Sequence, residues 1–185
     1  MNQLQKIQLY FHNYFLKREL AKLSVTRNSV NFEKAKTFGI VFTTADLAEV
    51  KAMQAFCKTL EKAGKKVEIL GYAGKVDKNT TIDLPHFTRK DLNWHLTPKT
   101  EAISSFIKKD FDILVNFHAG TCRPLEYIAA CSHAHCRVGR YHPDQTQCYD
   151  LMVTLKENES HKAYSDMVFQ YLKMINKDNN VKAAV

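Results

Sequence analysis

The sequence lacks the motifs and segments that identify several large classes of protein. No uncharged run approaches the roughly 18–20 residues that a membrane-spanning helix needs. Neither G-x-G-x-x-G nor G-x-x-x-x-G-K-[ST] occurs, which argues against a standard dinucleotide or P-loop site. G-x-S-x-G is also absent, so the usual hydrolase nucleophile motif is missing. We expect no signal peptide, because charged residues interrupt the apolar N-terminal segment.

The composition is that of a globular protein with an excess of basic residues. A length of 185 residues favours one domain, and 45% hydrophobic residues argue against a disordered or collagenous chain. There are 27 Lys and Arg residues against 19 Asp and Glu, a formal net charge of +8. Residues 1–36 hold seven basic and two acidic residues, so the excess is concentrated there. A basic surface attracts nucleic acid, anionic lipid or acidic proteins, although such a surface can also serve solubility alone.

The five cysteines are an odd number, which favours a reduced cytoplasmic protein with free thiols. Four of them share the segment 118–148 with four histidines, which are potential metal ligands. The run from Cys131 to Cys136 spans a predicted helix end and strand start, where successive side chains diverge. Zinc sites normally present tight ligand pairs across short turns. We therefore expect no metal site here.

Residues 3–23 have the periodicity of an amphipathic helix, with basic residues gathered in its second half. The recurring apolar residues are Leu4, Ile7, Phe11, Tyr14 and Phe15. Because large aromatic side chains favour burial, we expect Phe11, Tyr14 and Phe15 to pack this helix on the rest of the protein. A helix lying on a membrane surface, or docked on RNA or a protein, is the alternative interpretation.

From residue 37 onward, short apolar runs alternate with helical patterns. Gly64 is placed to end the first of these helices in the left-handed conformation, and Thr97 with Pro98 has the pattern of a helix start. Strands are predicted at 38–43, 67–72, 111–117, 136–141 and 150–155, with a possible short strand at 86–89. Strand–helix–strand units force neighbouring strands to be parallel. The sequence therefore predicts an α/β fold: a single Rossmann-like three-layer domain with a mostly parallel sheet of order 2-1-3-4-5 and an extra N-terminal helix. We expect a basic helix and connector at 1–36, the α/β domain at 37–176 and a flexible tail at 177–185.

Polar side chains follow the first and third predicted strands, where the strand order reverses. Open parallel sheets bind ligands at this point, and two helix N-termini would favour an anion there. The predicted ligand-binding residues are Thr43, Thr44, His118, Thr121 and Arg123. Arg140 and His142 follow the fourth strand and are further candidates for the same rim. In the alternative interpretation these loops are only connectors, and Asp46 with Glu49 merely caps a helix.

Three segments together resemble an uncharacterised family of small bacterial proteins with a domain of unknown function. They are FTRKDLNWHLTPKTEAISSFIKKDFDILVNF, EYIAACSHAHCRVGRY and YDLMVTLKEN, with signatures at Leu92–Trp94 before Pro98 and at Tyr149–Met152. The resemblance runs to Ile175 and implies no catalytic role. The segment from Phe111 to Tyr141 is also similar, more weakly, to one Rossmann-like half of heptosyltransferase-type glycosyltransferases. Those enzymes have two such domains, whereas this chain has room for one.

These observations favour a non-enzymatic cytoplasmic module that binds a polyanionic partner, either RNA or a ribonucleoprotein. An acidic protein or a membrane surface is an alternative partner. The predicted phosphate contacts are Lys17, Arg18, Lys22, Arg27, Arg89 and Lys90. Arg89 and Lys90 lie near Trp94, which is able to stack on a base. The rival hypothesis is an enzyme or sensor that binds a nucleotide or sugar phosphate between the first and third strands. We expect no catalytic residue and no cofactor in the polyanion-binding interpretation.

Overall fold

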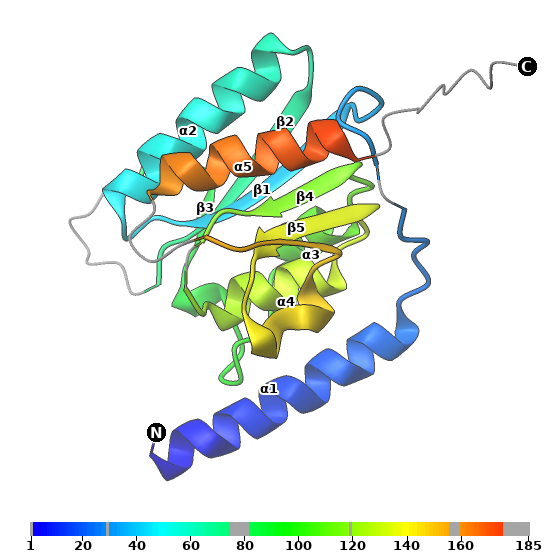
Figure 1. The fold of residues 1–185 in the computed structure, drawn as a ribbon. Coiled ribbons are helices and arrows are strands. Elements are labelled where there is room, and N and C mark those ends of the chain that lie inside the picture. Colours follow the sequence, from blue (N-terminus) through cyan, green and yellow to red (C-terminus); the bar gives the residue numbers. More distant parts are fainter. Residues whose placement is uncertain (1, 29, 75–81, 119, 156–159, 176–185) are drawn as a thin grey trace, which may run out of the picture.

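The structure is a computed structural model that describes residues 2–28, 30–74, 82–118, 120–155 and 160–175. Its centre is one open sheet of parallel strands (Figure 1). The strands are β1 (Thr37–Thr43), β2 (Lys66–Tyr72), β3 (His86–Phe87), β4 (Ile113–Asn116), β5 (Cys136–Arg140) and β6 (Leu151–Val153). They lie in the order β3-β2-β1-β4-β5-β6, which is the order of a doubly wound sheet.

The predicted α/β class and parallel sheet are confirmed, and the strand order differs by one strand. The five predicted strands are neighbours in the predicted order, but β3 adds a sixth strand beside β2. This edge strand pairs through only His86 and Phe87, opposite Gly71 and Tyr72. Two residues are too few to show a strand period, so the predicted order left it out.

Helices cover both faces of the sheet. They are α1 (Gln3–Lys22), α2 (Leu47–Lys62), α3 (Glu101–Lys108), α4 (Arg123–Cys131) and α5 (His161–Met174). Two 3-10 helices follow β3 and β5, at Arg89–Asp91 and Pro143–Cys148. Helices α2 and α5 lie on one face of the sheet, and α3 and α4 lie on the other (Figure 1).

Side chains of β1 point alternately to the two faces of the sheet, and each face has its own hydrophobic core. Phe38, Ile40 and Phe42 are fully buried beneath α2 and α5, whereas Val41 joins the core beneath α3 and α4. Such strands, covered on both faces, are almost uniformly apolar. This explains why the pattern predicted them well.

Two predicted helix features are confirmed and one is wrong. Asp46 caps α2, and Gly64 follows the helix with a φ of 75°, a conformation that glycine adopts without strain. Thr97 and Pro98 were expected to start the next helix, but α3 begins at Glu101. Pro98 instead forms a bridge with Leu92, which closes a loop over residues 92–98.

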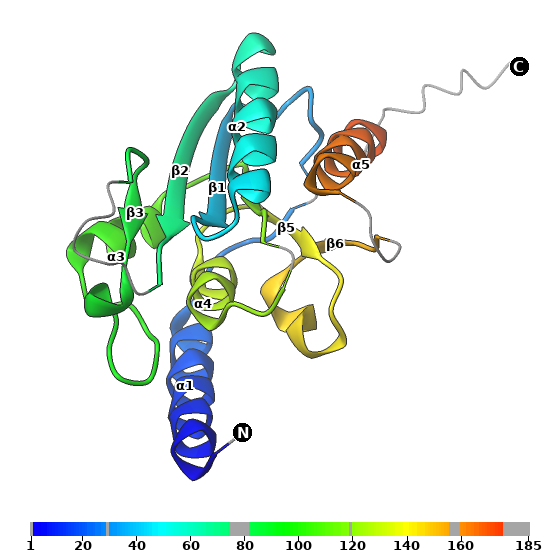
Figure 2. The same cartoon turned by 90° about the vertical axis from the view of Figure 1, so that its left-hand side faces the viewer.

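Helix α1 forms a further layer outside α4 (Figure 2). Its inward side carries the buried residues His12 and Leu16. The expected burial of the aromatic residues is wrong for two of them, because Phe11 is 38% exposed and Tyr14 is 53% exposed. The third, Phe15, stacks on His95 at a centroid distance of 4.3 Å. The helix therefore packs through a different side from the one that its most regular apolar stripe indicated.

The connector after α1 is tied to the domain. Arg27 donates to the carbonyls of Ser132 and Ala134, and Phe32 is buried. The division of the chain at residues 36 and 37 stays a prediction, and the expected tail at 177–185 lies outside the described residues.

Candidate functional site

A buried carboxylate organises the edge of the sheet where a ligand site was predicted. Glu49 lies in the first turn of α2 and is 1% exposed. Its Oε1 accepts hydrogen bonds from the Thr43 backbone N–H, at 2.7 Å, and from the Thr43 hydroxyl, at 3.0 Å. Its Oε2 lies 3.1 Å from Nδ1 of His118. The structure thus brings the predicted residues Thr43 and His118 together around Glu49, which the sequence had indicated only as part of a helix cap.

This contact orients the His118 ring. A carboxylate accepts, so Nδ1 carries the proton and donates to Glu49, which leaves Nε2 with a lone pair. Within the described part of the chain, Nε2 has no hydrogen-bond partner, and the side chain is 22% exposed. A carboxylate–imidazole pair with one free nitrogen is the arrangement that enzymes use for proton transfer.

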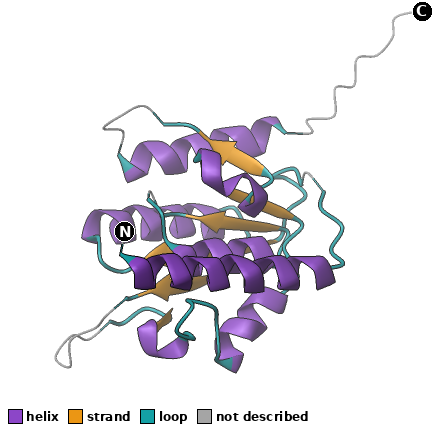
Figure 3. Cartoon of the chain, turned by 90° about the horizontal axis from the view of Figure 1, so that it is seen from below, coloured by secondary structure: helices purple, strands orange, loops and turns teal. Residues whose placement is uncertain are grey.

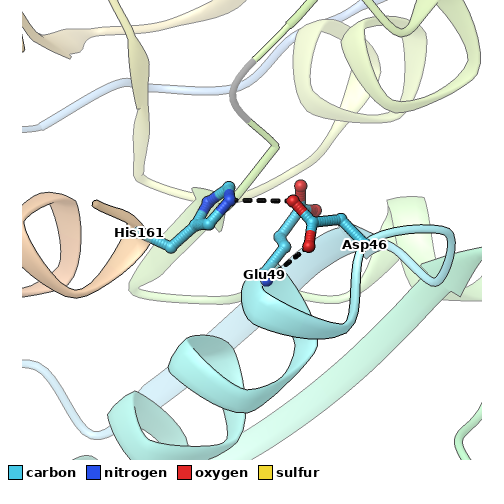
Figure 4. A group of neighbouring side chains, drawn as sticks. All are labelled: Asp46, Glu49 and His161. Atoms are coloured by element: carbon cyan, nitrogen blue, oxygen red, sulfur yellow. Dashed lines mark hydrogen bonds and ion pairs between the residues drawn. The ribbon is translucent and has the colours of Figure 1, made fainter. Parts of the chain in front are cut away.

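A second pair, Asp46 with His161, lies beside Glu49 (Figure 4). His161, at the start of α5, points toward Asp46, with 3.0 Å between Nε2 and Oδ2. Asp46 also accepts from the Ala48 and Glu49 backbone N–H groups, and the bond from Ala48 in particular lowers the pKa of Asp46. Arg140 ends β5 and lies with its guanidinium 3.5 Å from Nδ1 of His161. Together with Thr43 and Arg140, the two pairs therefore join β1, the start of α2, the loop after β4, the end of β5 and the start of α5.

Arg140 is the cation of this cluster. Its guanidinium lies over the ring of the buried Tyr164, 4.8 Å from the centroid. Burial lowers the pKa of Arg140. Its Nε is buried, and among the described residues nothing accepts a hydrogen bond from it.

The side chains of Asp46, Glu49 and His161 are also of the types that bind divalent cations. Their ligand atoms lie within 4.8 Å of one another. A metal-bound histidine usually donates its second N–H to an acceptor, but Nδ1 of His161 faces the donor group of Arg140. The contacts therefore favour a hydrogen-bonded Asp–His–Arg chain over a metal centre.

The cysteine–histidine segment 118–148 forms no comparable group among the described residues. Its four cysteines are buried. Burial raises the pKa of Cys131 to about 12 and that of Cys136 to about 11. A thiol binds metal as the thiolate, so these environments suit packing rather than ligation.

The remaining predicted ligand residues are dispersed. The backbone N–H of Thr44 donates to the backbone carbonyl of Tyr72, and Thr121 is exposed. Arg123 lies 3.3 Å from Glu126 and lines a cavity of about 490 Å³ beside α1. His142 accepts from the Asp144 backbone N–H at the start of a 3-10 helix.

Carboxylates of the chain itself occupy both helix N-termini that were expected to attract an anion. Asp46 caps α2, and Glu126 accepts from the Cys122 N–H at the start of α4. Both positions therefore already carry a negative charge, so they give no support to an external anion at the crevice.

The predicted phosphate-binding residues fall into two groups. Arg89 donates to the carbonyls of Asn93 and Trp94, and Arg27 is held on two carbonyls as described above. Lys22 pairs with Glu19 at 2.7 Å. By contrast Lys17, Arg18 and Lys90 are exposed, and none of the three forms an ion pair with another described residue.

The structure leaves an exposed apolar surface along α1, where the sequence favoured packing on the rest of the protein. Most of the large apolar side chains that are exposed in the described chain gather on α1 and on the loop beside it. We call this surface the α1 outer face: Leu4, Ile7, Tyr10, Phe11, Tyr14 and Trp94. The Trp94 ring lies 5.2 Å from that of Phe11, which joins the loop to the helix. Figure 3 views the molecule from this side, with α1 starting at the N label and lying in front of the other helices.

A protein-family model matches residues 8–175 and is described as a family of unknown function (DUF6913). The chain belongs to this family. The resemblance to an uncharacterised domain is thereby confirmed, and DUF6913 membership carries no activity with it. No curated protein and no solved structure matches the chain significantly. The bacterial origin and the similarity to glycosyltransferases stay predictions.

Proposed function

We propose that this chain is a binding module that docks on an anionic membrane surface through the α1 outer face. One observation carries the proposal: aliphatic and aromatic side chains that would normally be buried are exposed together on the outermost helix and on the loop beside it. Leu4 is 76% exposed, and Trp94 is 54% exposed. Apolar patches of this kind on a folded protein mark surfaces for interaction. Across the described residues, no helix is long and apolar enough to span a bilayer.

The net positive charge of α1 indicates that the partner surface is negatively charged. Four basic residues and one acidic residue lie between Gln3 and Lys22, and Lys17 and Arg18 are exposed and unpaired within the described chain. A second copy of the chain would bring like charges together at this face. An anionic partner instead complements the charge while its apolar part covers the aromatic side chains.

The residue types favour lipid over RNA. Tyr and Trp are enriched at membrane–water interfaces, and nearby Lys and Arg are attracted to anionic headgroups. Leu4 and Ile7 have no ring on which a base could stack, and Arg27 and Arg89 are held on backbone carbonyls. The predicted cytoplasmic location fits this proposal, because the cytoplasmic leaflet carries anionic lipid. RNA remains the rival partner.

Vesicle flotation tests the proposal. The full chain should float with vesicles of phosphatidylcholine and phosphatidylglycerol, and salt or pure phosphatidylcholine should reduce the floated fraction. Reversing Lys17 and Arg18 to Glu should weaken binding roughly 30-fold or more, at about 1 kcal/mol for each charge near the surface. Replacing Leu4, Tyr10 and Tyr14 with Ser should weaken binding at all salt concentrations.

Two matched control variants change the same number of basic and apolar residues as the test variants, but elsewhere on the surface. Reversal of Lys58 and Lys62 on α2, and replacement of Leu47, Tyr141 and Met174 with Ser, change exposed residues away from α1. These controls should float like the unmodified chain. Absence of flotation with anionic vesicles at low salt would contradict the proposal. Salt-dependent binding to single-stranded RNA by a chain that ignores vesicles would establish the rival.

A further inference from the structure

The Glu49–His118 pair lies at the point where the order of the strands reverses. From β1 the chain continues through β2 to β3 in one direction, and from β4 through β5 to β6 in the other. Helices α2 and α4, which follow β1 and β4, lie on opposite faces of the sheet. The loops after β1 and β4 therefore diverge, and open parallel sheets bind ligands in the resulting crevice.

The Glu49–His118 pair does more than satisfy a buried group. Both donors of Thr43 bind Oε1 of Glu49, so Oε2 is left to hold Nδ1 of His118. The carboxylate of Glu49 is already bonded by the Thr43 donors, yet its second oxygen is aimed at a ring whose Nε2 has no partner among the described residues. This is the relation of orienting carboxylate to base in catalytic dyads and triads.

We propose that His118 exchanges a proton with a small hydroxyl-bearing molecule held at the carboxyl ends of β1, β4 and β5. In the forward step Nε2 takes the hydroxyl proton, and the ligand oxygen keeps the electron pair of its broken O–H bond. The imidazolium formed is stabilised by Glu49, which keeps its bond to Nδ1. In the reverse step Nε2 returns the proton to the same ligand oxygen, and the O–H bond forms again. Arg140, whose guanidinium lies 3.5 Å from Nδ1 of His161, supplies the positive charge at this edge of the sheet.

The charge of the site fits a neutral, oxygen-rich ligand better than an anion. Arg140 is its fixed positive charge, while Asp46 and Glu49 supply two carboxylates at the same edge. Polyols, monosaccharides and nucleosides combine hydroxyl donors and acceptors without a negative charge. This site is independent of membrane docking, since it uses no residue of the α1 outer face.

Reaction with diethyl pyrocarbonate measures the nucleophilicity of each imidazole. The lone pair of Nε2 forms a bond to one carbonyl carbon of the reagent, and the ethyl carbonate that leaves decomposes to ethanol and carbon dioxide. His86 is the internal reference, because it is exposed and its Nδ1 lies 2.8 Å from a carbonyl instead of a carboxylate. We expect His118 to react at least as fast as His86 despite its smaller exposure, with the sites separated by peptide mass spectrometry.

Glu49→Gln should slow the reaction at His118 about tenfold and leave His86 unchanged, because the amide cannot stabilise positive charge on the ring. Asp112→Asn is the matched control, since this carboxylate accepts three hydrogen bonds from Lys36 and Thr37 at the opposite end of the sheet. Should Glu49→Gln fail to fold, Thr43→Val loosens the same carboxylate and should slow His118 to a smaller degree.

Protection from the reagent tests the ligand class. At least one member of a panel of polyols, monosaccharides and nucleosides should protect His118 and not His86. His118 reacting more slowly than His86, or equally in the Glu49→Gln and Asp112→Asn variants, would overturn the proposed proton transfer. Protection by no member of the panel would overturn the ligand class.

Discussion

The carboxylate of Glu49 lies 3.1 Å from Nδ1 of His118, although 69 positions separate the two residues in the chain. The contact joins the first turn of α2 to the end of β4, and so links the two halves of the sheet at its carboxyl edge. Because Thr43 supplies two further hydrogen bonds to the same carboxylate, the pair is held from the β1 side as well.

Thr43→Val should destabilise the protein through this network. Valine has nearly the same shape but no hydroxyl, so the charged Glu49 loses one buried hydrogen bond. A hydrogen bond to a charged group contributes about 1.5–3 kcal/mol, and urea unfolding should show a loss of that size. Thr59→Val on the exposed side of α2 is the control and should change the free energy of unfolding much less. Equal effects of the two substitutions would show that Glu49 does not depend on Thr43.

We expect Asp150 to lower the free energy of unfolding as the pH falls. Burial alone would raise the pKa of Asp150, but the hydrogen bonds and charge of Arg137 outweigh it and hold the pKa below the ordinary 3.8. The folded state therefore favours the carboxylate, whose contribution is complete above about pH 3.8 and is lost as the pH falls through the folded pKa. Urea unfolding between pH 6 and pH 3 measures this loss, and Asp150→Asn should be less stable at neutral pH and less sensitive to acid. Asp166→Asn, in an exposed pair with Lys162, should behave like the unmodified chain.

We expect His12 to weaken the packing of α1 as the pH falls, just as Asp150 lowers the stability of the fold in acid. It is buried against α4, and its Nδ1–H donates to the His95 carbonyl at 3.0 Å. Burial lowers the pKa of His12 from 6.5, although the bond to His95 acts in the opposite direction. The unfolded chain therefore takes up the proton first, so the packing of α1 is fully stable above pH 6.5 and weakens as the pH falls below it. His95, whose pKa is also lowered by burial, contributes with the same sign.

Hydrogen exchange of the α1 backbone amides measures this effect. Protection, corrected for the intrinsic exchange rate, should fall between pH 7.5 and pH 5.5, while that of β1 changes less. His12→Gln keeps a donor without the titration, so its protection should vary less with pH. Protection of α1 that is equal at both pH values would contradict the prediction.

Gly139→Ala should destabilise the sheet near its carboxyl edge. A Cβ at this position of β5 would lie 2.6 Å from the Tyr149 ring, which is itself held by a hydrogen bond from Asn116. Overpacking of a buried site costs about 1–3 kcal/mol, measurable by urea unfolding. In Gly139→Ala combined with Tyr149→Leu, the smaller side chain leaves room for the methyl group. The double variant should therefore lose less than the sum of the single losses, whereas additive losses would exclude the clash as the cause.

The local sequence pattern was enough to predict the layers of the fold, but not the side-chain contacts of the site. The strands could be predicted because their side chains are buried on both faces, which leaves a continuous apolar run. The two-residue strand β3 has no such pattern, and the start of α3 was displaced because Thr97 and Pro98 fit a helix start and a closed loop equally well. Thr43 and His118 were predicted from the rule that ligands bind where the strand order reverses, and the structure brings them together.

The amino-acid sequence by itself determined the alternation of strands and helices, and with it the parallel sheet and the edge where polar loops converge. These depend on short-range periodicity and on the limited ways to cover a parallel sheet. Tertiary structure alone decided which side of α1 packs inward, because Leu4, Ile7, Phe11 and Tyr14 form as regular a stripe as the residues around His12 and Leu16. It also decided that Glu49 holds His118. In the sequence, a carboxylate that caps a helix looks the same as one that orients a histidine. Only the position of β4 beside β1 shows that Glu49 contacts His118.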